Sequence, residues 1–200
     1  MDAPLPHYTY TDLEKFDPNK RWELIDGIPY AMSSPTLAHQ LLVGELYLAL
    51  RQHFKKGPCK VILAPFDVKI SDHNVVQPDL LVSCTDRLQF HYHEGAPELA
   101  IEVLSQSTLR HDRVRKLNLY ARSGVQEYWM VTPHPLLIEV LGNTGEGFLV
   151  RGSFTQDDKL RSFVFPELTI DLAQLLAALP PQPPIEGEVR ETAPVYATTP

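Results

Sequence analysis

Two acidic residues interrupt the most apolar stretches of the chain, and this placement limits how the chain can fold. Asp79 lies within the segment Val75 to Cys84, and Glu102 lies within Glu98 to Leu104; both segments are rich in Val, Ile and Leu. Together with Lys60 to Ile70, these segments are typical of central strands of one sheet. Because burying an unpaired charge is costly, we expect a cation to face these acids.

Segments with helical periodicity alternate with the predicted strands, so we predict a mixed α/β (α+β) fold. The predicted helices run over residues 42–56, 109–123 and 172–179. In the second helix, Val114, Leu117 and Ala121 are predicted to form the apolar side, and Gly124 is a natural terminator. Asp171 is placed to cap the third helix.

Turn chemistry defines the remaining strands. Asp26-Gly27 has the composition of a tight hairpin turn between strands predicted over residues 21–25 and 28–32. This hairpin places Glu23 in the middle of a strand. Further strands are predicted over residues 127–132, 136–141 and 148–154.

Length and composition indicate one domain. A chain of 200 residues suits a single domain, predicted here over residues 1–179, and six prolines within residues 180–200 predict an extended or disordered tail. Cys59 and Cys84 are too few for a disulfide framework, and we interpret them as free, partly buried thiols. No segment approaches the ~18 apolar residues that span a bilayer, so we expect no membrane contact and a cytoplasmic location.

The net charge of -7 weighs against broad, nonspecific affinity for nucleic acid, which normally depends on a basic surface. One basic stripe is nevertheless present in the segment RHDRVRK, residues 110–116. Arg110, Arg113 and Arg115 are therefore the candidates for a local contact with nucleic acid. The alternative is that the stripe is simply the solvated face of a helix.

Asp79 and Glu102 can together form a metal site. If their strands are neighbours, both carboxylates can point from one face toward a shared Mg²⁺, which prefers oxygen ligands. Glu23 can supply a third carboxylate, and Lys116 can reach the same point from the following helix. Such a group can hydrolyse a phosphodiester, because the metal neutralises charge and the lysine orients the attacking water. The alternative is that Glu23 faces solvent from its strand, that Glu102 and Lys116 form a structural ion pair, and that Asp79 is a turn or cap residue after Pro78.

Four segments, taken in order, identify a family. The runs WELIDGIPYAMSSPTLAHQ, VVQPDLLV, PELAIEVLSQST and RKLNLYARSGVQEYWMVTP resemble the Uma2 (DUF820) family of restriction-type endonucleases over residues 8–178. The resemblance implies the PD-(D/E)xK nuclease superfamily and a restriction-endonuclease-like core, in which a central mixed β-sheet is flanked by helices. It matches Asp79 to the PD aspartate, Glu102 to the acid of the (D/E)xK element, and Glu23 to the early glutamate.

The chain departs from the superfamily pattern at Leu104, where a lysine is expected. In the Uma2 family the lysine has moved to the following helix, and Lys116 matches that position. The family pattern also includes His39, which can contact phosphate or support the site.

The resemblance implies a magnesium-dependent endonuclease that accepts Mn²⁺ as a substitute, with DNA as the favoured nucleic acid and a homodimer as the assembly. Two alternatives stay open. One is a catalytically weak nucleic-acid-binding module of the same fold, for which the acidic composition speaks. The other is a paired-carboxylate hydrolase acting on another substrate, such as a glycoside.

Overall fold

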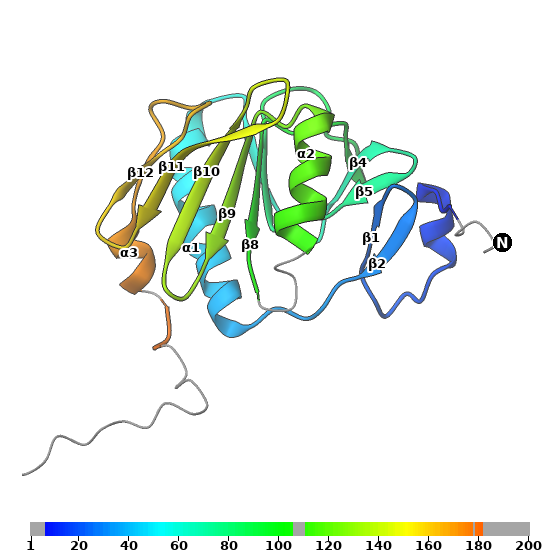
Figure 1. The fold of residues 1–200 in the computed structure, drawn as a ribbon, viewed down its shortest axis with the longest axis horizontal. Helices are drawn as coiled ribbons and strands as arrows, with labels where there is room; N and C mark the ends of the chain where they lie inside the picture. Colours follow the sequence, from blue (N-terminus) through cyan, green and yellow to red (C-terminus); the bar gives the residue numbers. More distant parts are fainter. Residues whose placement is uncertain (1–6, 106–110, 178, 182–200) are drawn as a thin grey trace, which may run out of the picture.

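A six-stranded sheet forms the centre of the molecule (Figure 1). The computed structural model describes residues 7–105, 111–177 and 179–181. The strand order is β11-β10-β9-β8-β6-β3, and all neighbours are antiparallel except β8 and β9. The six strands are β3 (Lys60–Leu63), β6 (Leu80–Ser83), β8 (Leu99–Val103), β9 (Glu127–Thr132), β10 (Leu137–Asn143) and β11 (Phe148–Thr155). The predicted mixed α/β fold is confirmed.

A second sheet has five strands in the order β2-β1-β5-β4-β7. Its strands are β1 (Trp22–Ile25), β2 (Ile28–Ala31), β4 (Asp67–Ser71), β5 (Asn74–Val76) and β7 (Tyr92–Glu94). Asp26 and Gly27 join β1 to β2 with φ values of 52° and 70°, the left-handed conformation that a tight hairpin requires. The predicted hairpin is therefore confirmed. A small third sheet pairs β12 (Lys159–Arg161) with β13 (Thr169–Asp171).

The prediction that three apolar segments belong to one sheet is wrong. Residues 60–70 divide into β3 and β4, and residues 75–84 divide into β5 and β6, with the two members of each pair in different sheets. A proline lies at each break, Pro65 in the first and Pro78 in the second. Because proline has no N–H to donate to the ladder, each strand ends there. The second break leaves Asp79 immediately before β6.

Helices cover both faces of the six-stranded sheet (Figure 1). On one face, α1 (Leu37–His53) buries Leu42, Leu46 and Leu50, and it continues into η2 (Phe54–Lys56). On the other face, the π-helical segment η3 (His111–Lys116) leads into α2 (Leu117–Ser123), which packs between the sheet and strands of the five-stranded sheet. A short 3₁₀ helix, η1 (Tyr10–Lys15), precedes β1. The chain also forms α3 (Leu172–Ala177), where the Asp171 carboxylate accepts a hydrogen bond from the Ala173 N–H.

The prediction of one apolar side formed by Val114, Leu117 and Ala121 is wrong for Val114, which is 51% exposed. Leu117 packs against the hydrophobic cluster beneath α2, in which Leu119 and Tyr120 are buried, and Lys116 is buried as well. The helix is turned this way because Lys116 and Tyr120 both donate hydrogen bonds to Glu102 on the sheet beneath it. A polar network, rather than the apolar periodicity alone, therefore decides which side faces inward.

The interpretation of the cysteines as free thiols is also wrong. Cys59 and Cys84 form a disulfide. The antiparallel register of β3 and β6 pairs Lys60 with Ser83, so the two cysteines, one residue further along, lie opposite each other. The cross-link ties together the ends of two neighbouring strands.

Parts of two predicted features lie outside the described residues: residues 182–200 of the predicted tail, and residues 109–110 at the start of the predicted second helix. Within residues 7–105, 111–177 and 179–181, no helix is both long and apolar enough to cross a membrane.

Candidate active site

Asp79 and Glu102 lie opposite each other at one end of the six-stranded sheet. The register of β6 and β8 pairs Leu80 with Ile101, and one step further it places Asp79 opposite Glu102. The Val103 N–H donates a hydrogen bond of 2.8 Å to Asp79 Oδ2, which fixes this carboxylate against β8. Since side chains alternate along a strand, both acids share the sheet face that α2 covers.

Lys116 holds two of the predicted carboxylates together. Its Nζ lies 2.8 Å from Glu102 Oε1 and 2.9 Å from Glu23 Oε1. All three residues are almost fully buried, with exposed fractions of 2% for Lys116, 1% for Glu23 and 3% for Glu102. The residues come from η3, β1 and β8, so the ion pairs form only in the folded chain. One ammonium group thus compensates two buried carboxylates, as the apolar setting requires.

Two further residues donate hydrogen bonds to this cluster, and neither has a role in the site predicted from the sequence. The Tyr120 hydroxyl donates to Glu102 Oε1 at 2.8 Å, and the Gln77 N–H donates to Glu23 Oε1 at 2.7 Å. Burial, followed by the charge of Glu102, raises the pKa of Tyr120 well above its usual value, so the hydroxyl remains a donor. The four-residue spacing from Lys116 to Tyr120 was the available signal, because it places both on one helix face.

A further carboxyl group, that of Asp67, is linked to the cluster through Gln77. The side-chain amide of Gln77 donates a hydrogen bond to Asp67 Oδ1 at 2.9 Å. Burial raises the pKa of Asp67; the hydrogen bond from Gln77 opposes this shift, and the negative charge of Glu23 adds to it. Gln77 therefore links the site to a carboxyl group in β4.

His39 lies beside Asp79 in the first turn of α1. Its Nε2 is 3.1 Å from Asp79 Oδ2. The backbone here is fixed by the N-cap, since Thr36 Oγ1 accepts a hydrogen bond from the His39 N–H. The buried Nδ1 has no hydrogen-bond partner among the residues that the structure describes. The imidazole is thus placed to orient the Asp79 carboxylate.

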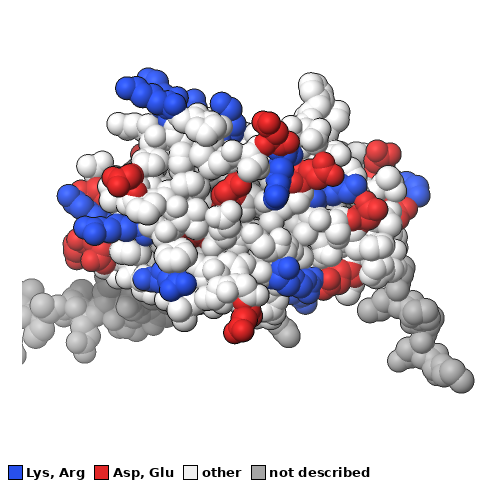
Figure 2. Space-filling view, turned by 90° about the horizontal axis from the view of Figure 1, so that it is seen from above, with Lys and Arg blue, Asp and Glu red and all other residues white. Residues whose placement is uncertain are grey.

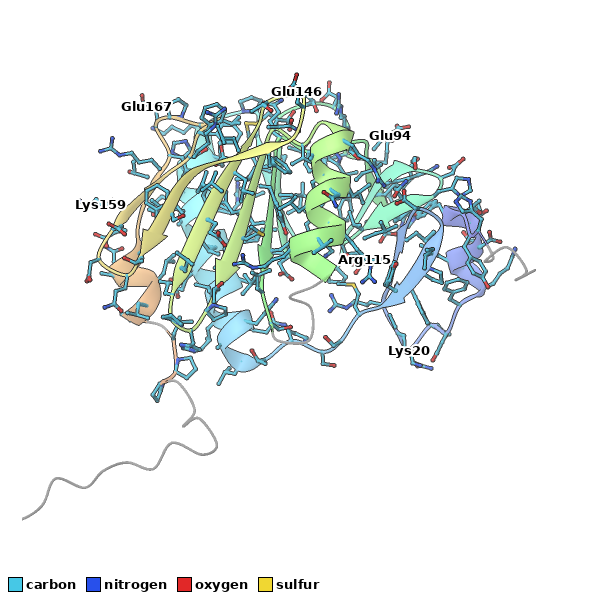
Figure 3. The ribbon with its side chains drawn as sticks, in the orientation of Figure 1. Lys20, Glu94, Arg115, Glu146, Lys159 and Glu167 are labelled. Carbon is cyan, nitrogen blue, oxygen red and sulfur yellow. A yellow bond between two sulfur atoms is a disulfide. The ribbon has the colours of Figure 1, made fainter. Side chains whose placement is uncertain are left out.

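These side chains line a cavity of about 300 Å³ that opens to solvent. The carboxylates of Glu23, Asp79 and Glu102 and the ammonium of Lys116 contribute to its lining, so acids outnumber the buried cation. Arg115, which is exposed, lines the same cavity, as does the partly exposed Arg21. Figure 3 shows Arg115 between α2 and the β1–β2 hairpin. The cavity therefore combines an acidic floor with a basic rim, which suits a cation and an anion bound together.

The structure brings one of the three predicted arginines to this cavity. Arg115 lines it, whereas Arg113 Nη2 lies 2.5 Å from Glu139 Oε2 on β10. Arg113 is therefore engaged in an ion pair on the sheet instead of facing the cavity. Arg110 lies outside the described residues.

The donor set fits a hard divalent cation. Among the described residues, no three His, Cys, Asp or Glu side chains gather as a metal-binding group. Mg²⁺ does not need such a cage, because it keeps several waters and usually binds proteins through one or two carboxylates. Asp79 and Glu102, opposite each other and lining the cavity, are the pair that meets this requirement.

Comparison with known proteins gives the fold class first and then the family. The crystal structure of a "putative nuclease belonging to DUF820" from Anabaena variabilis has the same fold, with a TM-score of 0.69 at 19% identity over 85% of this chain and 98% of that one. The restriction-endonuclease-like core is thereby confirmed. The chain belongs to the Uma2 family, described as "Putative restriction endonuclease", which matches residues 8–173. An uncharacterized protein of Synechocystis sp., slr1290, is 27% identical over 166 residues, or 79% of this chain and 86% of that protein.

Proposed function

We propose that the protein is a metal-dependent nuclease that hydrolyses phosphodiester bonds, with DNA as the favoured substrate. The observation that carries the proposal is Lys116, whose ammonium is shared by Glu23 and Glu102 in the wall of an open cavity, with Asp79 opposite Glu102. A purely structural ion pair does not need a cavity. The nuclease descriptions of the family and of the Anabaena protein support the same assignment.

Asp79 and Glu102 are the residues that would hold Mg²⁺, or Mn²⁺ in its place. When bound, the metal would neutralise charge on the phosphate and stabilise the leaving oxygen. The hydrogen bonds from Val103 and His39 keep Asp79 in position, and the Tyr120 hydroxyl does the same for Glu102. The carboxylates are thus oriented before any ligand arrives, which reduces the reorganisation needed during the reaction.

Lys116 is assigned the contact with the reacting atoms. Its Nζ can donate a hydrogen bond to the attacking water, which orients it, or to a phosphate oxygen, whose charge it stabilises. Glu23 accepts a hydrogen bond from Lys116, so it is a positioning residue that fixes the direction of the ammonium group. This assignment lets a lysine on the helix act where the superfamily pattern has one on the strand.

Arg21 is assigned a phosphate that flanks the scissile bond. It lines the cavity, and a guanidinium binds phosphate oxygens through paired N–H groups. The contact is local, which is compatible with a net charge of -7. Such a protein would depend on entry of the backbone into one cavity instead of on a broad basic surface.

The test is a cleavage assay with plasmid DNA, single-stranded DNA and single-stranded RNA, each with Mg²⁺, Mn²⁺ or a chelator. The variants are Asp79→Asn and Lys116→Met, and Lys159→Met is a matched control, because Lys159 is exposed on β12. We expect wild type and the control to cut only when metal is present. Both site variants should lose about 100-fold or more in cleavage rate. If wild type binds nucleic acid without cutting it, the binding-module alternative replaces the proposal.

A further inference from the structure

An arginine–tyrosine pair stands at the rim of the cavity. The Arg115 guanidinium carbon lies 4.7 Å from the centre of the Tyr30 ring, and both residues line the cavity. Tyr30, in β2, is partly buried and packs against the hydrophobic cluster beneath α2, whereas Arg115 is exposed. The core therefore holds the ring, and the ring holds a guanidinium group beside the catalytic side chains.

A guanidinium plane held in this way offers a flat surface for a nucleobase. Proteins that bind unpaired bases stack them on aromatic rings or on arginine planes, because every base has a π-face. We propose that Arg115 and Tyr30 form a stacking platform for an unpaired base next to the scissile phosphate. The substrate class is then a single strand or an unpaired end of nucleic acid. This inference rests on the proposed nuclease function.

The depth of the site supports an unpaired substrate. Glu23, Glu102 and Lys116 are each no more than 3% exposed, and the cavity above them measures about 300 Å³. This volume lies at the lower end of the range for small-ligand pockets. A phosphate must therefore leave the smooth outline of a duplex to reach the carboxylates, and the backbone of a single strand does this more readily.

A groove adjoins the cavity, and Arg115 is not among the residues that line it. A second hollow of about 750 Å³ shares Arg21, His39 and Asp79 with the cavity. Its other lining residues include basic Lys20 and the apolar residues Leu63 and Pro65. Positive charge beside apolar surface is the combination that binds a single strand, through its phosphates and its bases respectively.

On the face seen from above in Figure 2, Lys and Arg side chains are interspersed with Asp and Glu. Figure 3, drawn in the orientation of Figure 1, shows Lys20 and Arg115 below this upper face. Arg115 lines the cavity, Lys20 lines the groove and Arg21 lines both, so these three residues are placed to guide a strand to the site.

Binding measurements with the full-length protein and a chelator separate the platform from the chemistry, because no cutting can occur without metal. The probes are fluorescent single-stranded DNA, its RNA counterpart, the same DNA as a duplex, and a single strand whose bases have been removed. We expect wild type to bind the single strands more tightly than the duplex and about tenfold more tightly than the abasic strand. The RNA arm shows whether the ribose 2′-OH changes the affinity.

Two substitutions of Arg115 distinguish stacking from a simple phosphate contact. Arg115→Ala and Arg115→Lys should both abolish the preference for a strand with bases, since lysine keeps the charge but lacks the plane. Arg151→Ala is the matched control, because Arg151 also lies over an aromatic ring, Phe163 at 4.3 Å, but does not line the cavity. This control should bind as wild type does. Thermal unfolding of each variant checks that the fold is retained.

The outcomes separate the two proposals. Two results together would show that Arg115 contacts a phosphate and that the platform is wrong. Arg115→Lys would bind as wild type does, and Arg115→Ala would reduce the steepness of log K against log salt concentration by about 0.7. Equal affinity for abasic and intact strands, or tighter binding of the duplex, also overturns the platform while the nuclease proposal stands. If wild type binds none of the probes and also cuts none of them when metal is supplied, the nuclease proposal itself fails.

Discussion

Two buried glutamates lie on neighbouring strands of the central sheet, and their surroundings differ. Glu102 on β8 is paired with the Lys116 ammonium and lines an open cavity. Glu127 on β9 faces the other side of the sheet and accepts hydrogen bonds from three neutral donors: the Trp129 indole, the Ser162 hydroxyl at 2.8 Å and the Val164 N–H at 2.5 Å. The parallel register pairs Leu99 with Glu127 and Glu102 with Met130, which puts the two acids on opposite faces.

The surroundings of the two glutamates distinguish a structural carboxylate from a reactive one. Around Glu127, the neutral donors tie β9 to the chain that follows β12, and this carboxylate does not line the cavity. Around Glu102, the compensating cation is shared with a second acid, and a ligand can approach. Burial of a carboxylate alone therefore does not indicate an active site. A cation that two acids share in the wall of a cavity does indicate one.

The largest expected effect is on activity. Glu102→Gln removes one charge from the proposed metal site while keeping the shape of the side chain, so we expect cleavage to fall by about 1,000-fold. Lys116 still has Glu23 as a partner, so the variant should stay folded. The cleavage rate and the thermal unfolding midpoint are measured on the same preparation. A variant that cuts at a rate near that of wild type would remove Glu102 from the mechanism.

The matched substitution on the other face should act on stability instead. Glu127→Gln places an amide N–H₂ against donors, which breaks at least one hydrogen bond and leaves a buried donor unsatisfied. We expect the free energy of unfolding to fall by about 2 kcal/mol. The rate of cleavage per folded molecule should remain near that of wild type. Urea unfolding gives the first quantity, and an unchanged midpoint would show that the Glu127 network adds little to stability.

His39 should have an intermediate effect on the metal requirement. Because its Nε2 lies 3.1 Å from Asp79 Oδ2, His39→Ala releases a carboxylate that is assigned to the metal. Loss of such a supporting contact typically costs about 10- to 100-fold in metal affinity or activity. We expect a higher Mg²⁺ concentration for half-maximal cleavage, with partial recovery at saturation. If only the maximal rate falls, His39 acts on the substrate and not on Asp79.

The smallest expected effect is on the pH dependence of stability, through the buried pair of His93 and Ser83. His93 is fully buried, with Nε2 2.9 Å from Ser83 Oγ, and burial lowers its pKa below the usual 6.5. For a depressed pKa, the stabilisation is complete above the unfolded value and is lost as the pH falls through the folded one.

The wild type should therefore lose stability as the pH falls below the usual histidine pKa of 6.5, and this loss should be smaller in His93→Gln. The measurement is the free energy of unfolding in urea as a function of pH. Equal slopes for the two proteins would contradict a neutral imidazole in the fold.

Much of the site could be predicted because the sequence violates an energetic rule in a visible way. Asp79 and Glu102 interrupt apolar runs, and the structure places them opposite each other, Asp79 immediately before β6 and Glu102 in the neighbouring strand β8. The Asp26-Gly27 hairpin followed from local turn chemistry, and the structure contains it. These features depend on a few adjacent residues, so the pattern of the sequence contains them.

The remaining features depend on contacts between distant segments. Two of the three partners of Glu127 lie 35 and 37 residues further along the chain, and the disulfide joins cysteines 25 residues apart. Spacing along the sequence does not indicate such contacts. Pro65 and Pro78 indicate where each apolar segment divides between the two sheets. The high apolar content of the segments instead favours one continuous strand in each.

The comparison of Glu102→Gln with Glu127→Gln in one cleavage experiment tests the central claim most directly. Each variant loses one buried carboxylate from the same sheet, and each is incubated with single-stranded DNA and Mg²⁺ under conditions in which both are folded. The account predicts that Glu127→Gln cuts at nearly the wild-type rate and that Glu102→Gln does not cut measurably. Equal cutting by the two variants would contradict the assignment of the Glu102–Lys116 cluster as the active site.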